Sequence, residues 1–365
     1  MDMTQIAISK GYISIEKHSV TTQDGYILSL FRIPAPRNQH APKTAANKPA
    51  VLLQHGLLDS SWAWVANFPS NSLGFMLADR GYDVWFGNSR GNFYSLGHVS
   101  FPTNSSEFWD FSWDEMAKYD LPAAVSYILA QTGLSKISYV GHSQGTTQAL
   151  AAFGENEDFA KHINLAVLLA PAAYASHASG LFPILADLDL DELFMLFGVK
   201  EFLPDATILQ KIAPELCFLL PEDCEYFFFA LVGSSNNLNS TRIQVYVSET
   251  PAGTSVKNMA HWAQLVRAPG FQHFDYGSAQ ENMKHYGTPT PPPYFLANIT
   301  VPLAIYYAGE DALADPTDVA LLLATLPKPT VVHQLYTPAA AHLDYTWGSD
   351  STVVGIYEDV IGQLN

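Results

Sequence analysis

Charged side chains are scarce in this sequence, and cationic ones are the scarcest. Only 15% of the 365 residues are Asp, Glu, Lys or Arg, well below the usual quarter, whereas 48% are hydrophobic. This composition excludes a disordered chain and predicts a globular protein with a large buried core. The 18 Lys and Arg against 35 Asp and Glu give a formal net charge of −17, which would repel a phosphate backbone. We therefore expect no nucleic-acid partner.

Long apolar runs are also missing. No run approaches the roughly 18 residues that a membrane-spanning helix needs, and there are no internal repeats or coiled-coil heptads. The opening residues 1–5, Met-Asp-Met-Thr-Gln, are neither basic nor followed by an apolar stretch of the kind found in signal peptides. We therefore expect no transmembrane segment, and a mature or trimmed chain without a visible signal peptide.

Cysteine is nearly absent. The chain has two, Cys217 and Cys224, and on their own two buried free thiols explain them as well as a disulfide does. Three Asn-x-Ser/Thr sequons are consistent with the secretory pathway, where a disulfide is also permitted. These candidate glycosylation sites are Asn104, Asn239 and Asn298.

The first half of the chain alternates strand and helix patterns. Residues 11–22 alternate apolar and polar side chains, and a second strand pattern at 25–33 follows the turn residues Gln-Asp-Gly at 23–25, which predicts a hairpin. Continuous apolar runs, typical of strands covered on both faces, follow with helical stretches between them. This order predicts an α/β fold with a mostly parallel, doubly wound sheet. The predicted strands are 50–54, 82–87, 137–140 and 165–170, and the predicted helices are 75–80, 116–129 and 146–153.

After residue 171 the alternation of strand and helix patterns stops. Helical pieces rich in Phe and Leu follow at 185–198, 206–220 and 225–233, and a stiff Thr-Pro-Thr-Pro-Pro-Pro linker begins at residue 288. Strand patterns resume at 301–309 and 331–336. We therefore expect an α/β core in two parts with an inserted, mainly helical cap or lid, divided as residues 1–171 (core), 172–300 (cap) and 301–365 (core).

The segment Gly141-His142-Ser143-Gln144-Gly145 matches the G-x-S-x-G pattern of a nucleophile elbow. The predicted strand before it and the predicted helix after it supply the context that this pattern requires. Side chains at positions 141 and 145 would collide with the crowded strand and helix, which explains the glycines. The alternative is an ordinary strand-to-helix loop with a solvated serine. The context favours Ser143 as a nucleophile.

With the elbow, the predicted sheet and the inserted cap are typical of an α/β-hydrolase fold. A serine nucleophile needs a base and an acid, which in that fold follow in the order Ser, Asp or Glu, His. Asp311 follows the first resumed strand and is the predicted acid, with Glu310 as the alternative. Two histidines follow it in the sequence. His333 falls within the last predicted strand, whereas His342 lies in the loop after it. His342 is therefore the predicted base.

The same chemistry needs N–H donors for an oxyanion. In this fold they are the residue after the nucleophile, here Gln144, and a residue in the loop after the first core strand. We assign the second to Leu57, with Gly56 allowing the close approach. We expect structural roles for His55 and for His142. No metal or cofactor is predicted, because no His-x-x-x-His or similar spacing converges on one element.

Seven motifs together resemble the acid lipase family, typified by gastric and lysosomal acid lipases. The 16-residue run at 108–123, Phe-Trp-Asp-Phe-Ser-Trp-Asp-Glu-Met-Ala-Lys-Tyr-Asp-Leu-Pro-Ala, is far more specific than the elbow. The resemblance places the nucleophile, acid and base on Ser143, Asp311 and His342, and the oxyanion donors on Leu57 and Gln144. The other matching runs are 53–58, 87–92, 141–146, 251–259, 311–316 and 342–345.

This resemblance implies a serine-triad lipase acting through an acyl-enzyme. Its substrates would be neutral-lipid esters, triacylglycerols or cholesteryl esters, and it would work at acidic pH in a secreted or lysosomal setting. It also implies a movable lid and a cap disulfide similar to Cys217–Cys224, although the spacing here is shorter. The alternatives are a short-chain carboxylesterase, which would differ only in the cap, and a non-catalytic binding protein, which would generally have lost the nucleophile or base.

Overall fold

The computed structural model describes residues 2–41, 48–180, 183–184, 200–202, 233–268 and 270–365. The helical pieces predicted between residues 185 and 232 lie outside the described residues, and so do Cys217 and Cys224. The predicted boundaries of the cap, 172 and 300, therefore stay a prediction.

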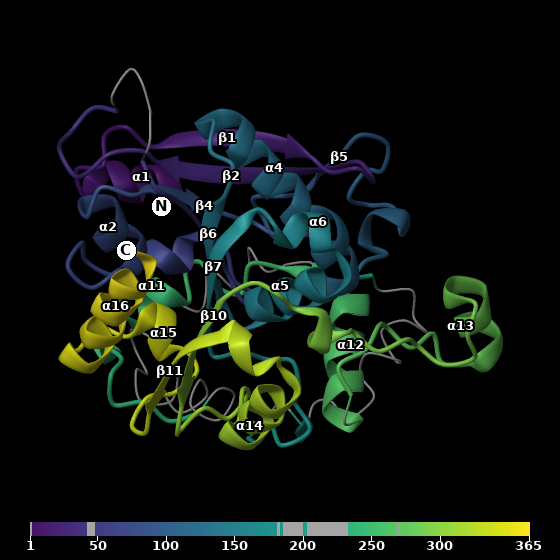
Figure 1. Cartoon of the computed structure of the whole chain (residues 1–365). Helices are drawn as coiled ribbons and strands as arrows, with labels where there is room; N and C mark the ends of the chain where they lie inside the picture. The colour runs from purple at the N-terminus through teal and green to yellow at the C-terminus, as the bar shows by residue number, and fades with distance from the viewer. Residues whose placement is uncertain (1, 42–47, 181–182, 185–199, 203–232, 269) are drawn as a thin grey trace.

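A mixed sheet forms the centre of the molecule (Figure 1). The hairpin predicted at the start is present, because β1 and β2 pair antiparallel, and β2 also pairs antiparallel with β4 and with the short strand β5 (Gly97–His98). From β4 onward neighbouring strands are parallel, as the apolar runs predicted. The strand order is β1 (Glu16–Thr21), β2 (Tyr26–Ile33), β4 (Asp83–Phe86), β3 (Ala50–Gln54), β6 (Ile137–His142), β7 (Ile163–Leu169), β10 (Leu303–Ala308), β11 (Val331–Thr337).

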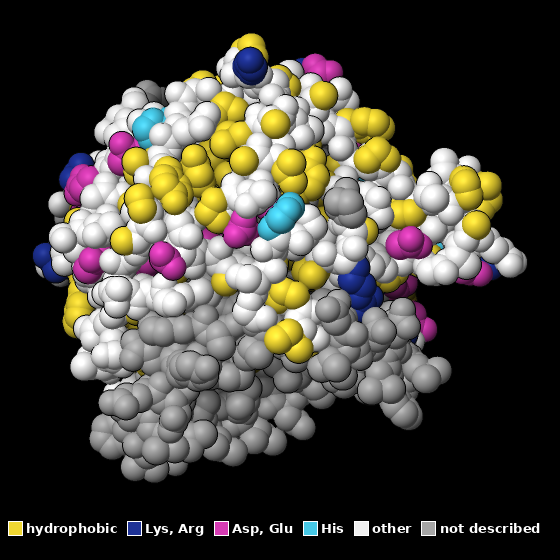
Figure 2. Space-filling model, turned by 90° about the horizontal axis from the view of Figure 1, so that it is seen from below, with side chains coloured by type: hydrophobic (Ala, Val, Ile, Leu, Met, Phe, Trp, Pro, Cys, Tyr) yellow, Lys and Arg dark blue, Asp and Glu magenta, His cyan; other side chains and the backbone are white. Residues whose placement is uncertain are grey.

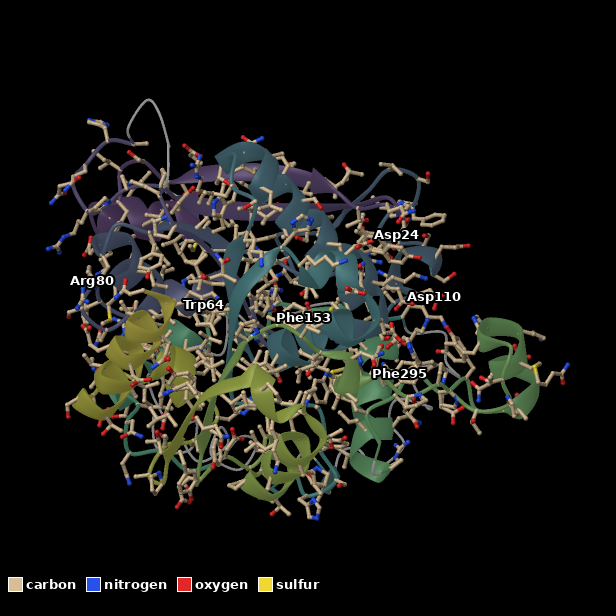
Figure 3. All side chains as sticks on the ribbon, in the orientation of Figure 1. Asp24, Trp64, Arg80, Asp110, Phe153 and Phe295 are labelled. Carbon is tan, nitrogen blue, oxygen red and sulfur yellow. The ribbon has the colours of Figure 1, made fainter. Side chains whose placement is uncertain are left out.

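Helices cover both faces of the sheet, which explains why every residue of β3, β4 and β6 is buried. Because side chains alternate along a strand, Val51 and Leu53 enter one core and Leu52 the other. Trp64 and Phe153, one from each core, lie inside the molecule in Figure 3. The first core contains residues of α1 (Met3–Ser9), α2 (Leu73–Asp79) and α16 (Ser351–Leu364), and the second contains residues of α4 (Leu121–Thr132), α5 (Gln144–Glu155) and α14 (Pro316–Thr325).

The helix predicted at 116–129 is less regular than its pattern suggested. It begins with the short helix α3 (Trp113–Glu115), capped by Ser112, passes through a π-helical segment at Met116–Asp120, and continues as α4 to Gly133. Pro122 explains the interruption, because proline has no N–H to donate to the carbonyl four residues earlier. Asp120, the last residue of the π-helical segment, is 3% exposed.

The described part of residues 172–300 lies beside the sheet domain and contains mostly helices. Of these, α13 projects from the body at the right of Figure 1, whereas α12 lies next to α5. Among the described residues, no helix is both long and apolar enough to cross a membrane. The elements are β8 (Glu201–Phe202), α11 (Ile243–Tyr246), β9 (Thr254–Ser255), α12 (Val256–Arg267) and α13 (Ala279–Tyr286).

A buried arginine joins the hairpin to the π-helical segment. Arg90 is 1% exposed, and its guanidinium lies 3.9 Å from the ring centroid of Tyr26. It donates to Asp24 at 2.6 Å and to Asp120 at 2.7 and 2.9 Å. Both carboxylates therefore depend on one cation for their charge compensation.

Replacing Arg90 by Met should lower the free energy of unfolding by about 3–5 kcal/mol, because it leaves the buried carboxylate of Asp120 and the partly buried one of Asp24 without a cation. Urea unfolding followed by circular dichroism measures this change. The matched control is Arg80→Ala, which breaks the exposed pair with Glu358 on the opposite side of the molecule from Asp24 (Figure 3). That change should cost less than about 1 kcal/mol. Equal losses in the two variants would contradict this account.

Candidate active site

Ser143 occupies a strained turn between β6 and α5. Its backbone has φ 52° and ψ −120°, a conformation that a non-glycine residue rarely adopts. The surrounding backbone leaves no room for an easier turn. A Cβ on Gly145 would lie 2.5 Å from the carbonyl oxygen of Gln54 in β3, and one on Gly141 would lie 2.9 Å from the carbonyl of Gly145. The glycines are therefore required for the reason that the pattern predicted.

The structure brings the three predicted triad residues together. The Nε2 of His342 lies 2.8 Å from the Oγ of Ser143, and its Nδ1 lies 2.9 Å from both carboxylate oxygens of Asp311. All three side chains are buried. Because an ionised Asp311 can only accept, Nδ1 carries the proton, and Nε2 is free to accept from the serine hydroxyl. This is the geometry of a nucleophile with its general base.

The parallel sheet explains why distant segments meet here. Ser143 follows β6, Asp311 follows β10 and His342 follows β11, so all three lie beyond the carboxyl ends of parallel strands. Asp311 is held further by the backbone N–H groups of Leu313 and Ala314, at 2.9 and 2.8 Å.

The two alternatives considered from the sequence are not part of this cluster. The side chain of Glu310 is exposed. His333 lies in β11, 2.8 Å from Asp359. The geometry therefore favours Asp311 and His342 over them.

Both predicted oxyanion donors border Ser143. Gln144 is the first residue of α5, where a helical N–H has no carbonyl partner within the helix. Leu57 follows Gly56, which approaches so closely that an added Cβ would lie 3.0 Å from the Cβ of Ser143. Their role as donors stays a prediction.

His55 fixes the loop that carries Leu57. It donates from Nδ1 to the carbonyl of Gly56 at 2.8 Å and accepts at Nε2 from the N–H of Ser89 at 3.0 Å. Burial lowers the pKa of His55 to about 4, against the opposing effect of the Gly56 hydrogen bond. His55 is therefore a neutral structural residue, as expected.

No role was predicted for the side chain of Gln144, which links the elbow to α12. Its Oε1 accepts from the indole N–H of Trp262 at 2.7 Å and from Asn258 at 2.8 Å. The run at 251–259 contained part of this signal, because Asn258 lies in one of the runs by which the sequence resembles the acid lipases. The partner helix comes from the segment predicted to form the cap.

Asp59 is a second residue whose importance the sequence did not reveal. It lies two positions after Leu57, is 5% exposed, and accepts from the N–H of Ser60 at 2.8 Å. Burial raises the pKa of its carboxyl to about 7, while hydrogen bonds from Ser60 and Thr250 act in the opposite direction. A neutral carboxyl in this loop is therefore favoured at acidic pH.

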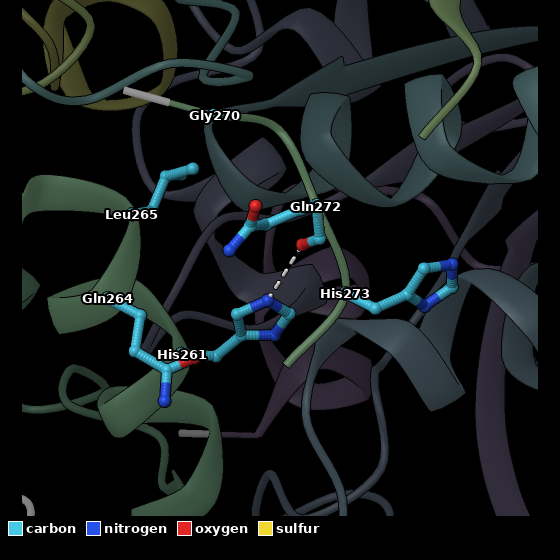
Figure 4. A pocket seen from close by; sticks show the side chains of 6 residues that line it. All are labelled: His261, Gln264, Leu265, Gly270, Gln272 and His273. Carbon is cyan, nitrogen blue, oxygen red and sulfur yellow. Dashed lines mark hydrogen bonds between the residues drawn. The ribbon is translucent and has the colours of Figure 1, made fainter. Parts of the chain in front are cut away.

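A separate hollow lies between α12 and residues 270–273 (Figure 4), with room for about one water molecule. His261 donates to the carbonyl of Gln272 at 3.0 Å across it. At its edge His273 contacts Glu155 at 2.7 Å and Asp114 at 3.5 Å. Burial opposes the charge on His273, but these carboxylates raise its pKa to about 9. Within the described ranges, no group of three or more His, Cys, Asp or Glu is arranged to hold a metal ion.

Comparison with known proteins agrees with this architecture. The model of the family described as "alpha/beta hydrolase fold" matches residues 49–349, and that of "Partial alpha/beta-hydrolase lipase region" matches residues 3–68. A soluble variant of monoglyceride lipase from Saccharomyces cerevisiae superposes with a TM-score of 0.57 over 96% of each chain. At 14% identity this likeness concerns the fold alone.

Curated relatives are much closer in sequence. The gastric triacylglycerol lipase of Bos taurus is 43% identical over 100% of this chain and 91% of its own. The human lysosomal acid lipase/cholesteryl ester hydrolase is 44% identical over 96% of this chain and 88% of its own. A putative lysosomal acid lipase/cholesteryl ester hydrolase of Crotalus adamanteus is also 44% identical, over 96% and 87%. With this similarity along nearly its whole length, the chain belongs to the acid lipase family of α/β-hydrolases and is a carboxylic ester hydrolase.

Proposed function

We propose that this protein is a serine-triad lipase that hydrolyses neutral-lipid esters, triacylglycerols or cholesteryl esters, to free fatty acids. The observation that carries the proposal is the buried hydrogen-bonded chain from Ser143 through His342 to Asp311. The substrate class rests on the relatives, which are named as triacylglycerol lipases and cholesteryl ester hydrolases.

The mechanism follows from the atoms in this chain. The Oγ of Ser143 attacks the ester carbonyl carbon while Nε2 of His342 takes its proton, and Asp311 orients and charge-balances the resulting imidazolium. The backbone N–H groups of Leu57 and Gln144 receive the oxyanion. His342 then protonates the leaving alcohol, which leaves the fatty acyl group on Ser143. Water, deprotonated by the same imidazole, releases the fatty acid. These steps require neither metal nor cofactor.

Acidic working pH is the second part of the proposal. A buried carboxyl on the oxyanion loop, Asp59, is neutral below about pH 7, so acid conditions leave no uncompensated charge beside Leu57. His55 also stays neutral in mild acid, because its pKa is lowered to about 4 by burial. Both groups favour an intact oxyanion loop under acidic conditions.

We also propose a secreted or lysosomal location, which the exposure of the glycosylation sequons supports. Asn104 and Asn298 are exposed and Asn239 is half-buried, so at least two of the three sequons are open to glycosylation. We further propose that residues 172–300 form a cap and that Cys217 and Cys224 are bonded, both of which the relationship to acid lipases supports.

A neutral lipid surface is the partner that the composition favours. The net charge of −17 opposes binding to anionic surfaces. On the described part of the face shown in Figure 2, hydrophobic side chains are more numerous than Lys and Arg. Contact with an uncharged oil surface is therefore less opposed than contact with an anionic one.

Replacing Ser143 by Ala should abolish ester hydrolysis without unfolding the protein, and Asp311→Asn should lower kcat by about 10⁴-fold, because the imidazole loses its orienting acceptor. The readout is the rate on a dissolved short-chain nitrophenyl ester, with thermal unfolding as a check on the fold. Glu310→Gln is the matched control and should stay within a few-fold of the parent. A larger loss for Glu310→Gln than for Asp311→Asn would refute the assignment of the acid.

The substrate class can be tested with emulsified triolein and cholesteryl oleate beside a dissolved short-chain ester, from about pH 4 to about pH 8. We expect turnover of at least one long-chain emulsion, with a maximum on the acidic side. Turnover of the dissolved ester alone would identify a carboxylesterase instead. No turnover of any ester would leave a binding protein and overturn the proposal.

Asp59→Asn should change how stability depends on pH. The folded pKa of about 7 lies above the usual unfolded value of about 3.9, so between these values the folded state binds the extra proton. The free energy of unfolding is then highest below about pH 4 and falls as pH rises through about 7. The asparagine variant lacks this contribution to the pH dependence of stability, because its side-chain amide does not titrate.

Urea unfolding at about pH 5 and about pH 7 measures the difference, and the parent should lose up to about 1.4 kcal/mol per pH unit more than the variant. Asp158→Asn is the control, because that side chain is 94% exposed. The free energy of unfolding of Asp158→Asn should change with pH as that of the parent does. Parallel losses in the parent and Asp59→Asn would contradict the prediction.

A further inference from the structure

His142, the residue before the nucleophile, makes a contact that the mechanism above does not use. It is the last residue of β6 and is 2% exposed. Its Nε2 lies 2.9 Å from the backbone carbonyl oxygen of His342, 200 positions later in the chain. The two imidazole rings lie 4.9 Å apart between centroids. The elbow therefore contacts the base by two routes, through Ser143 to its ring and through His142 to its backbone.

The chemistry of this contact fixes the state of His142. A carbonyl oxygen can only accept, so Nε2 must carry the proton. Burial, followed by the electrostatic effect of the neighbouring His342 ring, lowers the pKa of His142 to about 3, against the opposing effect of the hydrogen bond to the His342 carbonyl. Its Nδ1 has no hydrogen-bond partner among the described residues and lies against Gly56. His142 is therefore a neutral donor with one N–H, and this N–H is directed to His342.

The loop that carries His342 is held on its other side by Asp344. One carboxylate oxygen accepts from the N–H of Ala341 at 2.8 Å and from Asn237 at 2.6 Å, and the other accepts from Ser235 at 2.5 Å. These bonds anchor the loop but do not reach the backbone of His342 itself. Among the described residues, the hydrogen bond to that carbonyl comes from His142.

We propose that His142 is a positioning residue that ties the backbone of His342 to the elbow that carries Ser143. The inference rests on the proposed function, because it matters only if His342 moves a proton to and from Ser143. Nucleophile and base then move as one body, so their 2.8 Å hydrogen bond survives motions of the loop. A displacement of about 1 Å in such a pair can cost about 10²-fold in rate.

Three substitutions of His142 separate positioning from packing. Gln places an amide N–H at nearly the reach of Nε2, Asn has the same chemistry one bond shorter, and Leu has no donor. We expect the Gln variant to keep kcat on a dissolved short-chain ester within about fivefold. We expect the Asn and Leu variants to lose about 10- to 100-fold in kcat, with KM changed less than about twofold.

The second readout is the rate at which a fluorophosphonate modifies Ser143, because this reaction needs the Ser–His pair but not a lipid pocket. It should fall in parallel with kcat in the Asn and Leu variants, and return with Gln. If the Leu variant does not fold, the comparison of the Gln and Asn variants alone tests the positioning role. Equal rates for Gln and Asn, or a change in KM rather than kcat, would overturn the proposal.

Ser143→Ala separates this inference from the proposed function. If that variant kept full activity, the triad itself would be wrong. If it were inactive while the Leu and Asn variants of His142 reacted at the parental rate, the triad would stand and only the positioning role would fail.

Discussion

The site depends on how closely α5 approaches the backbone of β3 and β6. At Gly145 this approach is so tight that an added Cβ would lie 2.5 Å from the carbonyl of Gln54. The chain can then turn from strand to helix only through the strained backbone of Ser143, φ 52°. This turn directs the hydroxyl past the end of the sheet, where the loops after β10 and β11 bring Asp311 and His342. The strain is offset by the two cores that hold the sheet between its helices.

Much of this arrangement was predictable, because it rests on local patterns. Fully buried parallel strands are continuous apolar runs, so the predicted bounds of β3, 50–54, match the observed ones. Chain order, together with position after the predicted strands, selected Asp311 and His342 from many carboxylates and histidines. The helix at 116–129 was predicted too simply, because periodicity does not show that Pro122 removes a hydrogen bond and that a π-helical segment results.

The parts that were not predictable are contacts between segments far apart in sequence. Asp59 has the sequence context of an ordinary loop aspartate, and only packing shows that it is buried without a cation. The link from Gln144 to Trp262 joins positions 118 residues apart. His142 was expected to serve in packing, and its donation to the backbone of His342 depends on how β6 and the loop after β11 meet. Local hydrophobic periodicity carries no information about contacts between residues so far apart in the sequence.

The order of the triad along the chain has a consequence for biosynthesis. Ser143 is made early, but β10 and β11, which complete the sheet beside β7, follow only after more than a hundred further residues. The hydrogen bond between His342 and Ser143 spans 199 positions. A growing chain therefore carries Ser143, the proposed nucleophile, through the synthesis of 199 further positions before His342, the proposed base, can reach it. Contacts of such long range also form slowly in folding, so on the proposed assignment the chain passes through an inactive intermediate before the site is complete.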